Sequence, residues 1–245
     1  MISVTLKDSI MRDVRQTSAL VSDLDGTLSK GRWIQSGYGY PLLQREFKSG
    51  HLIKSAGLVL DVARIKLLLR KNKGKDTAEA DGLKLFYDIL IKHKEGYEGD
   101  LVWHARKYFE SNAISPTVEI ANAYVSGPKF IATQSGSTGA QAAVEHFSFG
   151  GAVSNIDRFG YGRKGNRLVG INMIIRTGED KERLIGERLL SGFHIRLSEC
   201  AVMGDGLADI PLLMAARVRI ASPEAKPEVL ALPGIIPLSE LLKGQ

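Results

Sequence analysis

A short apolar run that ends in two aspartates limits the fold of this chain more than any other feature. The run is Ala19-Leu20-Val21-Ser22, and Asp23-Leu24-Asp25-Gly26-Thr27 follows it at once. A continuous apolar run of this length is typical of a strand that is buried on both faces. The glycine allows a tight turn, which would leave both carboxylates at the carboxyl end of the strand, where open α/β sheets bind their ligands. Paired carboxylates at such a place can hold a hard cation and attack an electrophile.

A calcium-binding loop is the main alternative for the Asp-x-Asp spacing. Such a loop needs a ligand at its fifth position and Glu at its twelfth, but these positions hold Thr27 and Ile34. An apolar strand pattern, and not a helical one, also precedes the aspartates. The pattern therefore favours a catalytic strand end over a calcium site or a surface turn.

Further apolar segments alternate with helical patterns along the chain. Strands are predicted at residues 130–133, 149–153, 200–203, 218–221 and 234–236, and helices at 3–16, 179–190 and 209–216. Residues 134–139 are predicted to form a loop of small residues, and residues 154–175 a hairpin excursion. The alternation predicts an α/β protein with a Rossmann-like parallel sheet flanked by helices.

The segment between the first two predicted strands is far longer than one crossover needs. Residues 41–126 carry helical patterns without a strand candidate, and the Gly- and Tyr-rich residues 30–40 are expected to form a loop or a small hairpin. We therefore predict an inserted all-helical cap domain at residues 31–126, and a core domain made of residues 1–30 and 127–245. Because the insertion follows the paired aspartates, it can serve as a lid over them.

Composition narrows the class of protein. The chain has 245 residues, of which 44% are hydrophobic and 24% charged, as in ordinary globular proteins. It contains no run of about 18 apolar residues, so no membrane span is expected. Residues 1–16 lack the apolar centre of a signal peptide, and the single cysteine, Cys200, cannot form an intramolecular disulfide. These features favour a cytoplasmic location.

The formal net charge is +6, with basic clusters at residues 64–75 and 158–167. This balance suits an anionic ligand, and nucleic acid is one such ligand. However, the chain shows no zinc-finger spacing and no aromatic RNA-binding motif. A solvated basic face therefore explains both clusters better than a nucleic-acid site does.

Three other pieces stand near the ends of predicted strands or at a helix start. They are Ser135-Gly136-Ser137, the lysine Lys181 after Thr177-Gly178, and Gly204-Asp205-Gly206-Leu207-Ala208-Asp209. Each has an ordinary explanation when taken alone: a helix cap, a surface lysine and a turn. Their order and placement together point to one site.

Together with the first aspartates, these pieces resemble the motifs of the haloacid dehalogenase (HAD) superfamily, in order and across almost the whole chain. Ser135-Gly136-Ser137, Lys181 and the helical insertion are similar to the phosphoserine-phosphatase-like branch. The resemblance implies that Asp23 is a nucleophile that forms an aspartyl-phosphate, and that Asp25 moves protons. It also implies a phosphate-binding set of Gly26, Thr27, Ser135, Gly136 and Lys181. The implied Mg²⁺ site is made by Asp23, the Asp25 carbonyl and Asp205, with Asp209 either as a further ligand or as a support for the ligands.

The implied activity is Mg²⁺-dependent hydrolysis of a small phosphate monoester, such as O-phosphoserine or a sugar phosphate. Cleavage of a carbon–halogen bond is not favoured, because a halide leaves without a proton and such an enzyme has no use for a proton donor at the position of Asp25. Two other functions stay open. The first is phosphoryl transfer to an acceptor other than water, as in a phosphotransferase or mutase, and the second is non-catalytic binding of nucleic acid or another anion by the basic clusters.

Several assignments have a neighbouring competitor. Thr133 also lies near the end of its predicted strand and competes with Ser135, while Lys164 and Arg183 are basic neighbours of Lys181. We expect the substrate specificity to come from the insertion and from residues 30–40, which include Arg32, Trp33 and Tyr38. Within the insertion, Arg45 and Glu46 could bind the carboxylate and the amine of an amino-acid phosphate.

Overall fold

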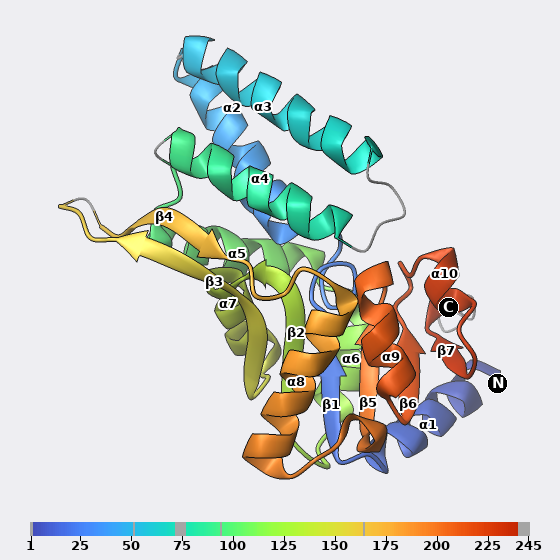
Figure 1. The fold of residues 1–245 in the computed structure, drawn as a ribbon. Coiled ribbons are helices and arrows are strands. Elements are labelled where there is room, and N and C mark those ends of the chain that lie inside the picture. The colour runs from blue at the N-terminus through green and yellow to red at the C-terminus, as the bar shows by residue number, and fades with distance from the viewer. Residues whose placement is uncertain (1, 51, 72–76, 94, 164, 240–245) are drawn as a thin grey trace.

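A computed structural model describes residues 2–50, 52–71, 77–93, 95–163 and 165–239, and these form a seven-stranded sheet with helices on both faces (Figure 1). The strands are β1 (Ala19–Ser22), β2 (Lys129–Gly136), β3 (Gly151–Gly160), β4 (Arg167–Asn172), β5 (Cys200–Gly204), β6 (Val218–Ala221) and β7 (Ile235–Pro237). Their order is β4-β3-β2-β1-β5-β6-β7. All neighbours are parallel except β3 and β4. The predicted α/β class with a parallel sheet is confirmed.

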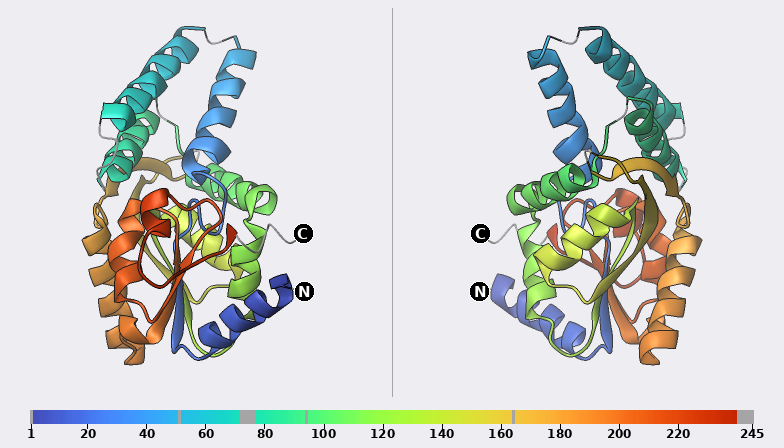
Figure 2. Two further views of the ribbon diagram at one scale, coloured as in Figure 1. Left: turned by 90° about the vertical axis from the view of Figure 1, so that its right-hand side faces the viewer. Right: turned by 90° about the vertical axis from the view of Figure 1, so that its left-hand side faces the viewer.

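Helices cover both faces of this sheet, as the two views of Figure 2 show. They are α1 (Ile2–Arg15), α6 (Ser115–Ala123), α7 (Ser137–Phe147), α8 (Gly178–Phe193), α9 (Ile210–Ala215) and α10 (Pro227–Leu230), with short 3-10 turns η2 (Leu197–Glu199) and η3 (Leu207–Asp209). In β1, Leu20 packs in one buried cluster with residues of α1 and α7. Val21 packs in the other cluster with residues of α8 and α9. Burial on both faces explains why this strand is apolar without alternation.

The predicted loop at residues 134–139 is wrong. Strand β2 continues to Gly136, and helix α7 begins at Ser137 without an intervening loop. Asn155 of β3 donates from Nδ2 to the Gln134 carbonyl at 2.5 Å, and Gly136 pairs with Asn155 in the sheet. This pairing with a distant strand extends β2 through polar residues whose local pattern does not predict a strand.

The strand predicted at residues 149–153 and the hairpin predicted at 154–175 are parts of one structure. Strand β3 runs on to Gly160 and pairs antiparallel with β4, so the hairpin belongs to the main sheet. Residues 30–40 form neither the loop nor the hairpin that we expected, because a π-helix, η1 (Ile34–Gly39), leads into α2 (Tyr40–Lys48). The burial of Trp33 and Tyr38 stabilises this helical turn through tertiary contacts.

The other elements between residues 31 and 126 are α3 (Leu52–Lys71), α4 (Ala78–Lys92) and α5 (Glu98–Asn112), together with α6. All are helical, as the sequence predicts. Helices α2, α3 and α4 stand beyond the carboxyl ends of β1 and β2, whereas α5 lies against α7 (Figures 1 and 2). The domain boundaries at residues 30 and 127 stay predictions.

Among the described helices, none has both the length and the apolar character that a membrane span requires. The cytoplasmic location stays a prediction.

Candidate active site

The two acidic motifs come together because their strands are neighbours. Asp23 follows β1 directly, and its amide donates to the Met203 carbonyl of β5 at 2.9 Å. Asp205 follows the end of β5, which runs parallel to β1. The carboxyl ends of both strands therefore deliver their aspartates to the same edge of the sheet.

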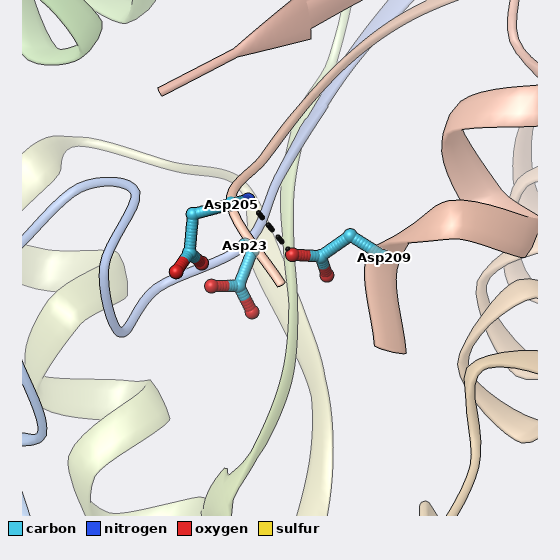
Figure 3. Close-up of side chains that lie close together, drawn as sticks. All are labelled: Asp23, Asp205 and Asp209. Carbon is cyan, nitrogen blue, oxygen red and sulfur yellow. Dashed lines mark hydrogen bonds between the residues drawn. The ribbon is translucent and has the colours of Figure 1, made fainter. Parts of the chain in front are cut away.

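Asp23, Asp205 and Asp209 form a compact carboxylate cluster (Figure 3). One carboxylate oxygen of each lies within 4.8 Å of the others. Asp209 Oδ2 accepts hydrogen bonds from the amides of Asp205 and Gly206, each at 2.9 Å. These bonds fix the turn after β5, and with it the position of Asp205.

Lys181 is the buried cation of the site. Its Nζ donates to Asp23 Oδ1 at 2.6 Å and to Asp209 Oδ1 at 2.5 Å. Helix α8 supplies this lysine from its first turn, which Thr177 and Asp180 close with a reciprocal capping box. Lys181 is therefore not an ordinary surface lysine, because its side chain is only 2% exposed.

The two carboxylate oxygens of Asp25 accept hydrogen bonds from different residues. The Trp33 amide donates to Oδ1 at 3.1 Å, and the Ser135 hydroxyl donates to Oδ2 at 2.5 Å. Thr133, the competitor of Ser135, accepts a hydrogen bond from the Ser135 amide at 3.0 Å through its own hydroxyl. Both residues line the cavity, and it is Ser135 whose hydroxyl binds Asp25.

Asp23, Asp25, Ser135, Lys181, Asp205 and Asp209 line one small cavity of about 20 Å³, together with Arg32, Thr133, Gln134, Gly206 and Ala208. The sequence motifs therefore converge on a single place. Gln134, Gly206 and Ala208 line the cavity but were not predicted as site residues. Gly206 and Ala208 lie between Asp205 and Asp209 in a motif that the sequence does show. Gln134 has no such signal, because it reaches the cavity only through the continuation of β2 past Thr133.

Gly26, Thr27 and Gly136 are not among the residues that line this cavity. The buried Thr27 hydroxyl donates to Asp205 Oδ1 at 3.3 Å, and the Gly26 carbonyl accepts from the Ser222 hydroxyl at 2.6 Å. Thr27 thus contacts one carboxylate of the cluster, and Gly26 is bonded to the segment that follows β6. Their predicted contact with a phosphate stays a prediction, as it does for Gly136.

Arg45 and Glu46 do not reach the cavity. Arg45 donates to Glu95 at 2.8 Å and lies 3.4 Å from Glu46. Both predicted substrate ligands, Arg45 and Glu46, therefore take part in ion pairs within the helical insertion. Of the two competitors of Lys181, Arg183 is exposed and pairs with Glu187 on the surface of α8. Lys164 lies outside the described residues.

Burial and neighbouring carboxylates make the negative charge of this cluster energetically unfavourable. The pKa of Asp23 is raised to about 7, first by burial and then by the negative charges of Asp209 and Asp25, against the opposing effect of Lys181. Burial by itself would lower the pKa of Lys181, but Asp209 and Asp23 outweigh it and raise this pKa above its ordinary value. The cluster therefore holds more negative charge than Lys181 balances.

A divalent cation fits this donor set. The cluster offers carboxylate oxygens only, which Mg²⁺ prefers, and a bound cation would compensate the excess negative charge on Asp23. Asp23, Asp205 and Asp209 are the side chains that can hold it.

Comparison with solved structures finds the same architecture elsewhere. A phosphoserine phosphatase solved with bound substrate is 17% identical, with a TM-score of 0.60 over 93% of this chain and 98% of that chain. A HAD family hydrolase from Salmonella enterica serovar Typhi is 17% identical, with a TM-score of 0.62 over 89% of this chain and 67% of that chain. A phosphoserine phosphohydrolase-like protein from Francisella tularensis is 14% identical, with a TM-score of 0.61 over 93% and 98%.

Comparisons with protein-family models and with curated proteins gave no match. At these identities the structural likeness concerns the fold. The chain therefore has the fold of HAD family hydrolases and phosphoserine phosphatases, as its motifs predict.

Proposed function

We propose that this protein is a Mg²⁺-dependent phosphomonoester hydrolase that works through an aspartyl-phosphate on Asp23. The observation that carries the proposal is the convergence of these residues in one cavity: the two aspartates that follow β1, a buried lysine and a second pair of aspartates. The fold shared with HAD hydrolases and phosphoserine phosphatases supports it. The proposed substrate is a small phosphorylated metabolite.

Asp23 is suited to attack phosphorus because a carboxylate needs no activating base. Its oxygen would form a bond to phosphorus while the ester oxygen leaves with the bonding electron pair. Mg²⁺, held by Asp23, Asp205, Asp209 and the Asp25 carbonyl, would keep Asp23 ionised and balance the charge of the phosphoryl oxygens.

Asp25 would carry the proton in both halves of the reaction. In its acid form it gives a proton to the leaving alkoxide, and as a carboxylate it then takes one from the water that attacks the aspartyl-phosphate. Inorganic phosphate leaves and the Asp23 carboxylate is restored. The two hydrogen bonds to Asp25, from Trp33 and Ser135, would keep its carboxyl group in place through both steps.

Ser135 and Lys181 are the groups that would bind the phosphoryl oxygens. Both line the cavity, and Lys181 already contacts the attacking residue at 2.6 Å. A fixed cation at this position stabilises charge as the phosphoryl group moves from one oxygen to another.

The test is hydrolysis of an aryl phosphate in the presence of Mg²⁺. We expect Asp23→Asn to abolish turnover while the protein stays folded, and Asp88→Asn, which alters an exposed acid paired with Lys84 on α4, to retain it. In the wild-type protein, mass spectrometry of a rapidly quenched reaction should find one phosphoryl group on the peptide that contains Asp23. Undiminished activity of Asp23→Asn would refute the proposal, and phosphate transfer to an added alcohol without release to water would point to a phosphotransferase.

A further inference from the structure

Arg32 is a charged residue of the cavity that the proposed reaction does not use. It lines the cavity together with Asp23, Asp25 and Lys181. The next residue, Trp33, has a fully buried side chain and donates from its amide to Asp25 Oδ1 at 3.1 Å. The backbone at Arg32 is therefore fixed next to the carboxyl group that would protonate the leaving oxygen.

This position sets Arg32 on the leaving-group side of the site. Lys181 contacts the attacking carboxylate of Asp23, so it faces the phosphoryl group. Asp25 must reach the ester oxygen to protonate it. The backbone segment that contacts Asp25, through the Trp33 amide, also contains Arg32. A group attached to the alcohol close to the ester oxygen would thus lie on the same side of the cavity as Arg32.

Each acidic residue that lines the cavity already has a role in the proposed reaction. Among the described residues that line it, the carboxylates are Asp23, Asp25, Asp205 and Asp209, and each has a place in the metal cluster or in proton transfer. The nearby acids of the insertion, Glu46 and Glu95, engage Arg45 and do not line the cavity. A positively charged substrate group would therefore find no carboxylate reserved for it here.

We infer that the site prefers a phosphomonoester whose short alcohol carries a carboxylate near the ester oxygen and no ammonium group, with Arg32 as the residue that selects it. This inference rests on the proposed function and names its substrate class. A guanidinium pairs with a carboxylate through two parallel hydrogen bonds, which gives both affinity and orientation.

The inference is tested with three two-carbon phosphate esters that differ in charge: phosphoglycolate, 2-hydroxyethyl phosphate and O-phosphoethanolamine. We expect kcat/KM to be ~10- to 100-fold higher for phosphoglycolate than for the neutral ester, the range of a charge-assisted hydrogen bond. O-phosphoethanolamine should be the poorest of the three. O-phospho-L-serine, which carries both groups, should fall below phosphoglycolate.

Variants of Arg32 separate selection from general binding. Arg32→Ala should reduce the ratio of kcat/KM for phosphoglycolate over hydroxyethyl phosphate to about one, and Arg32→Lys should restore part of it. Arg45→Ala is the matched control, because it removes a guanidinium that pairs with Glu95 outside the cavity. Thermal melting of each variant shows that it is folded.

The results of these assays test the proposed function and the inference about Arg32 separately. If the wild-type protein hydrolyses neither an aryl phosphate nor any of these esters, the proposed function fails. If it hydrolyses them but without preference for the carboxylate, or if Arg32→Ala lowers kcat/KM for all three by one common factor, the proposed function stands and the inference about Arg32 is overturned.

Discussion

Asp205 lies directly against Gly26: a β-carbon added to Gly26, whose φ is +95°, would fall 2.3 Å from Asp205 Oδ2. The turn after β1 and the turn after β5 thus meet at a position without a side chain. The Thr27 hydroxyl adds a hydrogen bond to Asp205 Oδ1 from the same turn. The position of a proposed metal ligand therefore depends on a glycine in the neighbouring motif.

Gly26→Ala should displace the Asp205 carboxylate. We expect it to lower kcat/KM for an aryl phosphate by ~10-fold or more, equivalent to about 1.4 kcal/mol, and to raise the Mg²⁺ concentration needed for half-maximal activity. Gly234→Ala is the control, because Gly234 also has a positive φ of +69° but no atom within 4 Å of an added β-carbon. An equal Mg²⁺ requirement in both variants would show that the contact with Asp205 does not matter.

Lys181→Met should destabilise the folded protein as well as inactivate it. It leaves the buried carboxylates of Asp23 and Asp209 without their shared cation, and removal of one partner from a buried ion pair costs about 3–5 kcal/mol. The free energy of unfolding, measured by urea denaturation without added metal, checks this value. Arg183→Met removes an exposed cation from the same helix and should cost less than ~1 kcal/mol. Similar losses in the two variants would contradict the assigned role of Lys181.

Mg²⁺ should stabilise the protein by binding to the carboxylate cluster. At about 100 times its dissociation constant it would add ~2.7 kcal/mol to the free energy of unfolding, which appears as a rise in melting temperature that a chelator reverses. Asp205→Asn should reduce this rise, whereas Glu228→Gln, at an exposed acid in α10, should preserve it. A rise of equal size in Asp205→Asn would place the ion elsewhere.

Asp61 should make the insertion sensitive to acid. Its pKa is lowered by the hydrogen bond from Lys92 at 2.7 Å, against the opposing effect of burial, and His93 lowers it further. A carboxyl group with a lowered pKa in the folded state stabilises the protein above its ordinary pKa of 3.8, and this stabilisation is lost as the pH falls through the lower value. Asp61→Asn should therefore be less stable than wild type at about pH 7, and the difference should shrink below about pH 4.

Urea denaturation at several pH values measures this difference. Asp88→Asn alters an exposed acid on α4 and should show a smaller difference at neutral pH. A deficit of Asp61→Asn that stays constant into the acid range would show that the carboxylate charge is not the cause.

Local patterns were enough to predict the elements that end in the site. Val21 and Val202 belong to apolar strands buried on both faces, and such strands are continuous in sequence. Aspartates followed by glycine mark the turns after β1 and β5, so the sequence alone places these acids at one edge of the sheet. Lys181 could be placed at a helix start because Thr177 and Gly178 precede it.

The same patterns failed where a residue's conformation depends on a distant partner. Gln134 and Ser135 extend β2 because Asn155 of β3 bonds to that segment, and no local signal contains this contact. The turn η1 is helical because Trp33 and Tyr38 are buried. Charge alone suggested Arg45 and Glu46 as substrate ligands. Neither residue lines the cavity, and Arg45 pairs with Glu46 and Glu95 within the insertion.

The sequence by itself determined the class of fold and the identity of the acids, because strand burial and glycine turns are encoded within a few neighbouring residues. Only the tertiary structure decided how Asp23 and Asp25 are held. Lys181, from a helix far along the chain, contacts Asp23, and Ser135, from the next strand of the sheet, contacts Asp25. These contacts arise from the order of the strands in the sheet and from the packing of α8 near their ends, and neither property can be read from spacing along the chain.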